Sequence, residues 1–198
     1  GFSGAPGHQK KRGANNGSYE TRLKTVNGWD PAVEKIGGEW DLLLQKGYKV
    51  WAARAASDFH NTKMDYWPCQ FSTTHLLAKS NSHNDVLAAF HSGTYWAQHG
   101  KFMDRVDFSV QTNKDNLSAG QSAVIDNMSN VKVNLSLRLN KHDWQGYRSS
   151  LDDLELVIIT ENDIRAIPFY DLTLTNNELD ISYNYQLNSP YTIFRWRG

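Results

Sequence analysis

VKVNLSLRL, residues 131–139, determines the fold of the C-terminal half: every second residue is Val or Leu, with polar or charged residues between. Successive side chains of a strand point to opposite faces, so this period of two is typical of a strand with one buried face. The stretches VDFSV (106–110) and ISYNYQL (181–187) alternate in the same way. From residue 104 to 198 we therefore predict roughly six strands without an intervening helix, which indicates an antiparallel β-sandwich.

The region before residue 104 has a different rhythm. Asp30 and Pro31 form an N-cap and first-turn pair, and apolar residues at helical spacing continue as far as Gly47. This pattern predicts one helix. The two glycines inside it, Gly37 and Gly38, lower its stability by about 1 kcal/mol each and indicate close packing.

Two strand-helix units are predicted next. The segment 48–56 has the composition of a short buried strand, and 72–78 resembles it. Ser82 is a good N-cap for a helix that ends at Gly93, and a further strand is predicted over 94–98. The expected fold class is therefore α/β plus all-β, with a first domain over 1–103 and a β-sandwich domain over 104–198.

Composition excludes some function classes. The 198 residues contain 21 Lys and Arg and 21 Asp and Glu, so the net charge of zero does not favour a non-specific nucleic-acid binder. A single cysteine, Cys69, cannot form an internal disulfide. No apolar run approaches the roughly 20 residues that cross a bilayer, so no membrane span is expected.

Asp58 and His60 are the best candidates for a chemical site. They stand two residues apart, just beyond the predicted strand 48–56, so both side chains can turn toward one pocket. A carboxylate with an imidazole suits Zn, Mn or Fe. On these residues alone, the spacing favours an ordinary hydrogen-bonded pair over a metal site.

Several further residues are candidates of a weaker kind. His8 lies in a turn rich in Gly and Pro, where a surface histidine is an equal reading, and Gln9 beside it is a possible pocket residue. His99 follows the predicted strand 94–98 and is a third candidate ligand. The favoured reading is that it supports a ligand from behind or lies at the surface. Tyr66 and Trp67 could line a pocket, and packing in the core explains them equally well.

The order of several short motifs resembles the PHP (polymerase and histidinol phosphatase) superfamily of metal-dependent hydrolases. The motifs are GFSGAPGHQ (1–9), GGEWDLLLQKG (37–47), SDFHN (57–61), DYWPCQF (65–71) and SGTYWAQHG (92–100). The resemblance implies the C-terminal part of a distorted βα barrel that holds two or three divalent metal ions, Zn, Mn or Fe. It also implies that metal-activated water hydrolyses a phosphoester.

Residue roles follow from the same resemblance. Asp58 and His60 match the family's final Asp-x-His ligand motif and would be catalytic, and His8 matches a preceding histidine ligand. The family's opening His-x-His motif would lie before Gly1, so we expect the enzyme to be the complete protein and this chain to be inactive without the missing N-terminal half of the barrel. The expected substrate is a phosphorylated small molecule.

Two expectations remain open from the sequence. Proteins of the PHP superfamily that carry an added β domain are often exported, so the resemblance slightly favours a periplasmic or secreted location. The alternative function is a non-catalytic module in which the β-sandwich binds carbohydrate or a protein partner through the tyrosines and tryptophans near its strands.

Overall fold

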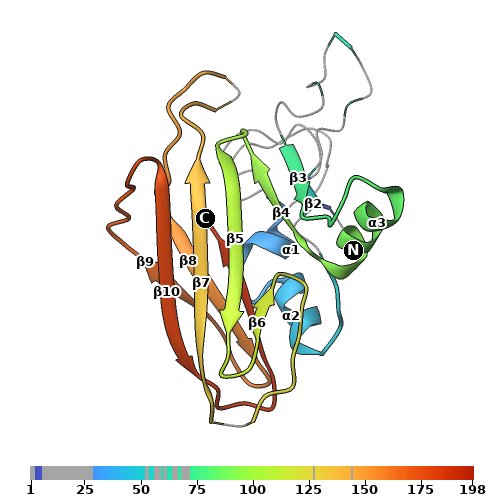
Figure 1. The fold of residues 1–198 in the computed structure, drawn as a ribbon, viewed down its shortest axis with the longest axis vertical. Coiled ribbons are helices and arrows are strands. Elements are labelled where there is room, and N and C mark those ends of the chain that lie inside the picture. Colours follow the sequence, from blue (N-terminus) through green and yellow to red (C-terminus); the bar gives the residue numbers. More distant parts are fainter. Residues whose placement is uncertain are drawn as a thin grey trace.

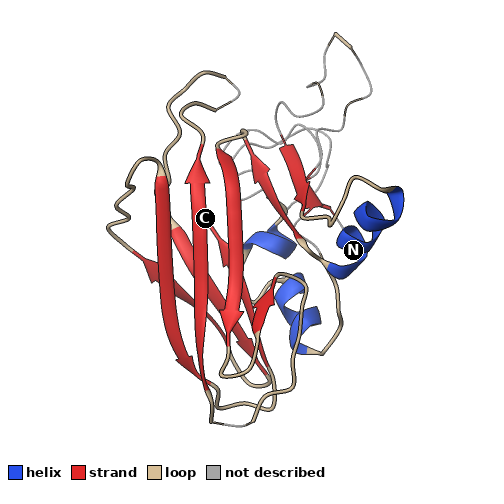
Figure 2. Cartoon of the chain, in the orientation of Figure 1, coloured by secondary structure: helices blue, strands red, loops and turns tan. Residues whose placement is uncertain are grey.

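The computed structural model shows a mainly-β protein in which two antiparallel sheets form the larger part (Figures 1 and 2). It describes residues 3–5, 29–51, 54–55, 59, 62–63, 67, 72–126, 128–143 and 145–198. Three short helices are found among these residues: α1 (Pro31–Glu34), α2 (Glu39–Gln45) and α3 (His83–Ser92).

Among the described residues, four strands occur in the first hundred positions and seven after them. The first four are β1 (Ser3–Ala5), β2 (Arg54–Ala55), β3 (Ser72–Leu76) and β4 (Tyr95–His99). The later seven are β5 (Met103–Gln111), β6 (Asn116–Ser118), β7 (Asn130–Leu139), β8 (Leu154–Thr160), β9 (Ile164–Phe169), β10 (Glu178–Gln186) and β11 (Thr192–Arg197). Thus β7 and β10 lie where the period-two pattern predicts them.

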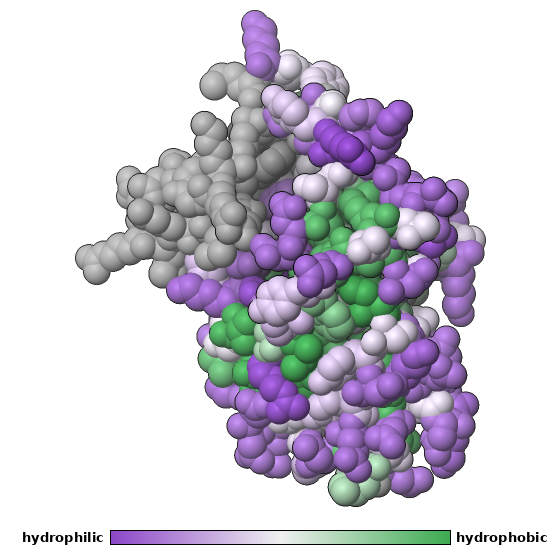
Figure 3. Space-filling model, turned by 90° about the vertical axis from the view of Figure 1, so that its left-hand side faces the viewer, coloured by the Kyte–Doolittle hydropathy of each residue, from purple (hydrophilic) through white to green (hydrophobic). Residues whose placement is uncertain are grey.

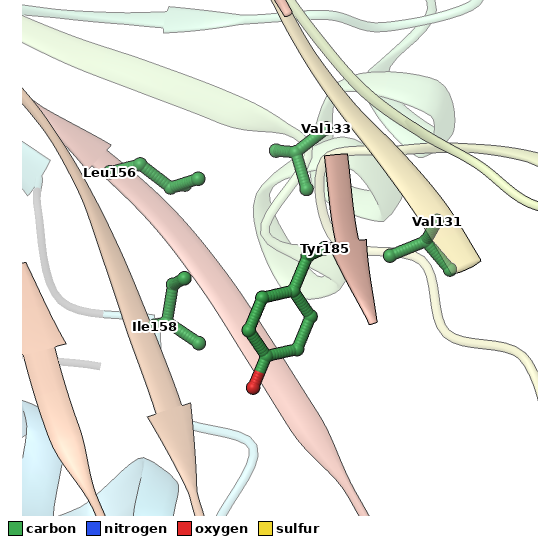
Figure 4. Packing of buried hydrophobic residues seen from close by; sticks show 5 residues of the cluster. All are labelled: Val131, Val133, Leu156, Ile158 and Tyr185. Carbon is green, nitrogen blue, oxygen red and sulfur yellow. The ribbon is translucent and has the colours of Figure 1, made fainter. Parts of the chain in front are cut away.

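Two sheets built from the later strands pack face to face. One has the order β10-β7-β5-β6 and the other β11-β8-β9, and every pairing in them is antiparallel. Val131, Val133 and Tyr185 of the first sheet meet Leu156 and Ile158 of the second in one buried cluster (Figure 4). These apolar side chains leave water on folding, which is the main stabilising contribution of such a core.

Helix α2 covers the outer face of the β11-β8-β9 sheet. Leu44 of α2 packs with Val157 and Ile159 of β8, which point away from the first sheet. Strand β8 is therefore buried on both faces. This explains its nearly continuous apolar sequence, LELVIIT, since both alternating sets of side chains lie in a core.

The prediction of a βα barrel is wrong. Among the described strands only β1 and β2 pair in parallel, while β3 and β4, which flank α3, pair antiparallel. Parallel barrel strands are covered on both faces and are nearly continuous runs of apolar residues. The sequence of β3 is STTHL and its residues are mostly half-buried, which suits a two-stranded antiparallel pair.

The predicted helix over 31–46 is broken into two. Asp30 caps α1 as expected, because its Oδ1 accepts a hydrogen bond from the Ala32 amide at 2.8 Å. The helix ends before Lys35, whose backbone is extended, and Gly37 then adopts a left-handed backbone with φ of +70°. Its amide donates to Asp41 Oδ2 at 2.9 Å, which starts α2 in a new direction. The two glycines therefore lie at a helix break, and Gly38 also packs closely, since an added Cβ would lie 2.9 Å from the carbonyl oxygens of Ala32 and Lys35.

Other predicted boundaries agree with the structure more closely. Ser82 caps α3 through the Asp85 amide at 3.2 Å, and Gly93 closes it with φ of +77°. Within the described part of the predicted strand 48–56, only β2 is a strand, and Tyr48 is 59% exposed. No helix within the described ranges is long and apolar enough to cross a membrane.

Candidate functional site

His99, one of the predicted site residues, is the last residue of β4 and lies opposite Ser72 of β3. The Ser72 hydroxyl is 2.8 Å from His99 Nδ1, and the Trp29 ring lies against the imidazole with 4.6 Å between ring centroids. Ser72 is buried, so it does not present a nucleophile at the surface. These contacts fix the ring orientation of His99, as the partners of a functional histidine commonly do.

The other face of the β3-β4 pair carries a second polar network, centred on Gln98. The buried Gln98 side chain accepts from the Met103 amide through Oε1 at 2.8 Å and donates to the Met103 carbonyl through Nε2 at 3.1 Å. These two bonds fix the orientation of the amide. Its Nε2 is also 2.8 Å from His75 Nε2.

The fixed amide determines the protonation of His75. Since Gln98 Nε2 can only donate, His75 Nε2 accepts, which requires the neutral imidazole with its proton on Nδ1. Burial lowers the pKa of His75, and the nearby Asp104 carboxylate opposes this in part. The ring also stacks on Trp96, with 3.9 Å between centroids. This network joins β4 to β5, so its role is structural.

Strands β1 and β2 bring two distant parts of the sequence together. They run parallel, with Ser3 opposite Arg54 and Ala5 opposite Ala55, so their carboxyl ends lie side by side. Strand β2 also lies next to both β3 and β4, and α1 lies next to β1. Trp29, the ring neighbour of His99, stands two residues before α1.

The predicted site residues fall mainly outside the described residues. His8, Gln9, Asp58, His60 and Tyr66 are the five in this position. Trp67 is 51% exposed, and its ring contacts Phe59 with 5.0 Å between centroids. His99 lies beside Ser72 and Trp29. Sequence reasoning missed Ser72 and Gln98, because only the antiparallel register places them beside His99 and His75.

The described residues do not form a complete metal site on their own. Within these ranges no group of three or more His, Cys, Asp or Glu side chains could hold a metal ion. Protein sites for transition metals typically use three or four protein ligands. A site that includes His99 would therefore need ligands from residues outside the described ranges.

No protein-family model matches the chain, and neither a curated protein nor a solved structure matches it.

Proposed function

We propose that this chain contributes to a metal-dependent phosphoesterase, in which His8, Asp58 and His60 bind divalent metal ions and His99 lies next to them. The observation that supports this best is the parallel pairing of β1 and β2. The resemblance of residues 1–100 to PHP hydrolases adds the reaction type. The proposal does not require the barrel of that family.

The strand pairing limits how far apart the proposed ligands can be. Paired strands are about 5 Å apart, which places Ala5 beside Ala55. His8 comes three residues after Ala5, and Asp58 three residues after Ala55. Three residues span at most about 10 Å, so the chain lengths permit both side chains to reach one point. Ligands gather in this way at the carboxyl ends of neighbouring parallel strands.

His99 extends this arrangement from a third strand. Strand β4 lies next to β2, and the Ser72 hydroxyl at His99 Nδ1 holds the ring in one orientation. With Nδ1 engaged by a hydroxyl, Nε2 is the nitrogen suited to a ligand or to a proton transfer. We therefore assign His99 to the pocket and Ser72 to its positioning.

The proposed chemistry follows from the residue types. A bound divalent ion supplies a Lewis acid and lowers the pKa of water toward neutrality. Asp58, His60 and His8 offer one carboxylate and two imidazoles, a donor set that suits Zn, Mn or Fe. Their task is to hold the ions and orient a phosphoester against them.

The test is the metal content of purified chain, measured by elemental analysis for the wild type and for Asp58→Ala and His60→Ala. We expect bound Zn, Mn or Fe in the wild type and a loss of at least tenfold in affinity in each variant, because each substitution removes a ligand. His142→Ala is the matched control, since His142 lies in the loop after β7.

Hydrolysis of a phosphomonoester by the complete protein is the second measurement. Turnover that depends on added metal and disappears in Asp58→Ala would support the phosphoesterase. Metal that binds equally to the wild type, Asp58→Ala and His142→Ala would show that the proposed ligands are wrong.

A second candidate function is carbohydrate binding by loops at one end of the two packed sheets. Tyr147 and Tyr170 are 70% and 80% exposed. Tyr147 lies between β7 and β8, and Tyr170 directly follows β9, whose last residue Phe169 pairs with Leu154 at the start of β8. The connections that carry the two tyrosines, β7 to β8 and β9 to β10, therefore lie at the same end of the sheets (Figure 1). Exposed aromatic rings of this kind serve as stacking surfaces in binding sites.

This second function has its own test. Affinity electrophoresis in gels with neutral polysaccharides should show retardation of the wild type and none for Tyr147→Ala with Tyr170→Ala. Tyr48→Ala is the control, because Tyr48 is also exposed, at 59%, but follows α2 at a different place in the fold. Equal mobility of all three proteins in every gel would reject carbohydrate binding.

A further inference from the structure

Strand β10 is an edge strand without the usual protection. It ends the β10-β7-β5-β6 sheet and is nine residues long, and its sequence ELDISYNYQ contains no Pro, Gly, Lys or Arg. Natural proteins shield exposed edges with short strands, prolines, charged side chains (especially Lys) or covering elements, because an open edge pairs readily with another strand. Strand β10 is long and has no proline or lysine, and Asp180 is its one fully exposed charged residue.

The other sheet edges differ from β10. Strand β6 has only three residues, and β9 contains Pro168 and the exposed Arg165. Strand β11 is contacted by the helical layer, because Arg197 bonds with Glu34 of α1 at 3.1 Å. In Figure 1, β10 forms the outer margin of its sheet, and none of the described strands lies on its far side.

Hydrogen bonds at both ends of β10 show which backbone groups face the open edge. The Leu139 amide of β7 donates to the Asn177 carbonyl at 2.8 Å, and the Leu187 amide donates to the Ser129 carbonyl at 2.9 Å. Odd-numbered residues therefore face β7. In an antiparallel ladder the alternate residues face the other way, so Asp180, Ser182, Asn184 and Gln186 direct their amides and carbonyls outward.

Glu178 marks the end of this free stretch. Its amide and carbonyl are both used by Thr175 in the turn before β10, at 2.9 Å each. The outward-facing residues are thus the four even-numbered positions from 180 to 186. Their centre is Tyr183, which is a half-buried member of the core (Figure 4 shows the neighbouring Tyr185).

We propose that β10 pairs antiparallel with β10 of a second copy of this chain, about a two-fold axis at Tyr183. This register places Asp180 opposite Gln186 of the second copy and Ser182 opposite Asn184, so that all four outward-facing residues find partners. Charge favours the antiparallel arrangement. A parallel, in-register pairing would bring Asp180 against Asp180, and like charges directly opposite each other are destabilising.

Apolar surface on this side gives the pairing a second contribution. Ile181 and Tyr183 pack against the core but remain half-buried, whereas Val133 and Leu135 of the central strand β7 are buried. Figure 3 views the molecule from the β9 and β10 side and shows hydrophobic side chains exposed between hydrophilic ones. A second copy at β10 would cover part of this surface, which adds hydrophobic stabilisation.

The oligomeric state of the full chain tests the proposal. Sedimentation equilibrium up to about 1 mM should show a monomer-dimer equilibrium. Asn184→Pro removes one outward amide and leaves the ladder with β7 intact, because proline is tolerated at an edge where its nitrogen faces solvent. We expect this variant to be monomeric, with the circular dichroism spectrum of the wild type.

A charge exchange identifies the register. Gln186→Glu places a carboxylate opposite Asp180 of the second copy at two symmetric positions, and should weaken the dimer about tenfold at low salt. Asp180→Asn combined with Gln186→Glu should restore wild-type affinity. Gln111→Glu is the matched control, since it makes the same change on β5 opposite Lys132. A monomeric wild type, or a dimer unaffected by Asn184→Pro and Gln186→Glu, would overturn the proposal.

Discussion

Replacing Asp41 by Ala should be among the most destabilising single substitutions in this chain. Arg195 of β11 donates to both carboxylate oxygens of Asp41, through Nε at 2.7 Å and Nη2 at 2.9 Å. The two side chains are 8% and 1% exposed. The guanidinium also lies 5.0 Å from the centroid of the Trp40 ring. Water therefore cannot replace the lost carboxylate easily.

The expected magnitude follows from what the substitution leaves behind. Asp41→Ala removes both acceptors of a buried Arg195 and the acceptor of the Gly37 amide. Breaking a buried ion pair in this way typically costs about 3–5 kcal/mol, because one charge stays uncompensated. Replacing both partners by apolar residues of similar size, Asp41→Leu with Arg195→Met, should recover most of this loss.

Urea unfolding followed by tryptophan fluorescence measures both values as free energies of unfolding. Glu155→Ala is the matched control, because Glu155 pairs with Arg197 in a more exposed ion pair, with 24% and 26% side-chain exposure. We expect it to cost about 1 kcal/mol or less. If Asp41→Ala costs no more than Glu155→Ala, or the double replacement costs more than Asp41→Ala alone, the reasoning from burial is refuted.

Three further predictions concern other parts of the fold. Burial lowers the pKa of His75 below its usual 6.5. The stabilising contribution of neutral His75 is therefore present above about pH 6.5 and declines as the pH falls toward the lowered pKa. His75→Gln should make the free energy of unfolding depend less on pH in this range. Burial raises the pKa of Glu34, although the charge of Arg197 opposes this shift. The contribution of Glu34 to stability is therefore lost as the pH rises through the raised pKa. Because Gln carries no charge, Glu34→Gln should be at least as stable as the wild type in thermal unfolding at pH 7. Gly93→Ala should lower stability by about 2 kcal/mol or more in urea, because φ is +77° and the added Cβ would lie 2.4 Å from the Trp51 ring; an unchanged unfolding midpoint would contradict the assigned backbone.

The strands at 106–110, 131–139 and 181–187 could be predicted because their signal is local. In 131–139 each residue's burial alternates with its neighbour's, and this pattern depends only on which face of one sheet meets the core. The caps Asp30 and Ser82 were predictable for the same reason, since each side chain bonds to an amide two or three residues away.

The barrel prediction failed where the signal is not local. A strand, a helix and a second strand in sequence can form a parallel or an antiparallel pair, and the pattern of apolar residues does not separate the two. The polar residues of β3 were the available clue, because a parallel barrel strand would be apolar on both faces. The apolar run 154–160 was a similar clue to a third layer over β8.

In the candidate site, too, local signals could be predicted from the sequence and long-range contacts could not. His99 could be selected from its place after a strand, but its partner Ser72 depends on the register of β3 against β4. Asp41 and Arg195 are 154 positions apart, and neither residue's neighbours in sequence indicate the other. Long-range pairs of this kind follow from topology and not from local pattern.

The burial of β8 on both faces has a consequence for biosynthesis. Arg195 is synthesised 154 residues after Asp41, so α2 cannot complete its ion pair until β11 has been made. Until then Val157 and Ile159 lack their helical cover, and such transiently exposed apolar surface promotes aggregation. Docking of α2 should therefore follow the synthesis of β11, and chains that still lack β11 should bind chaperones that recognise exposed apolar strands.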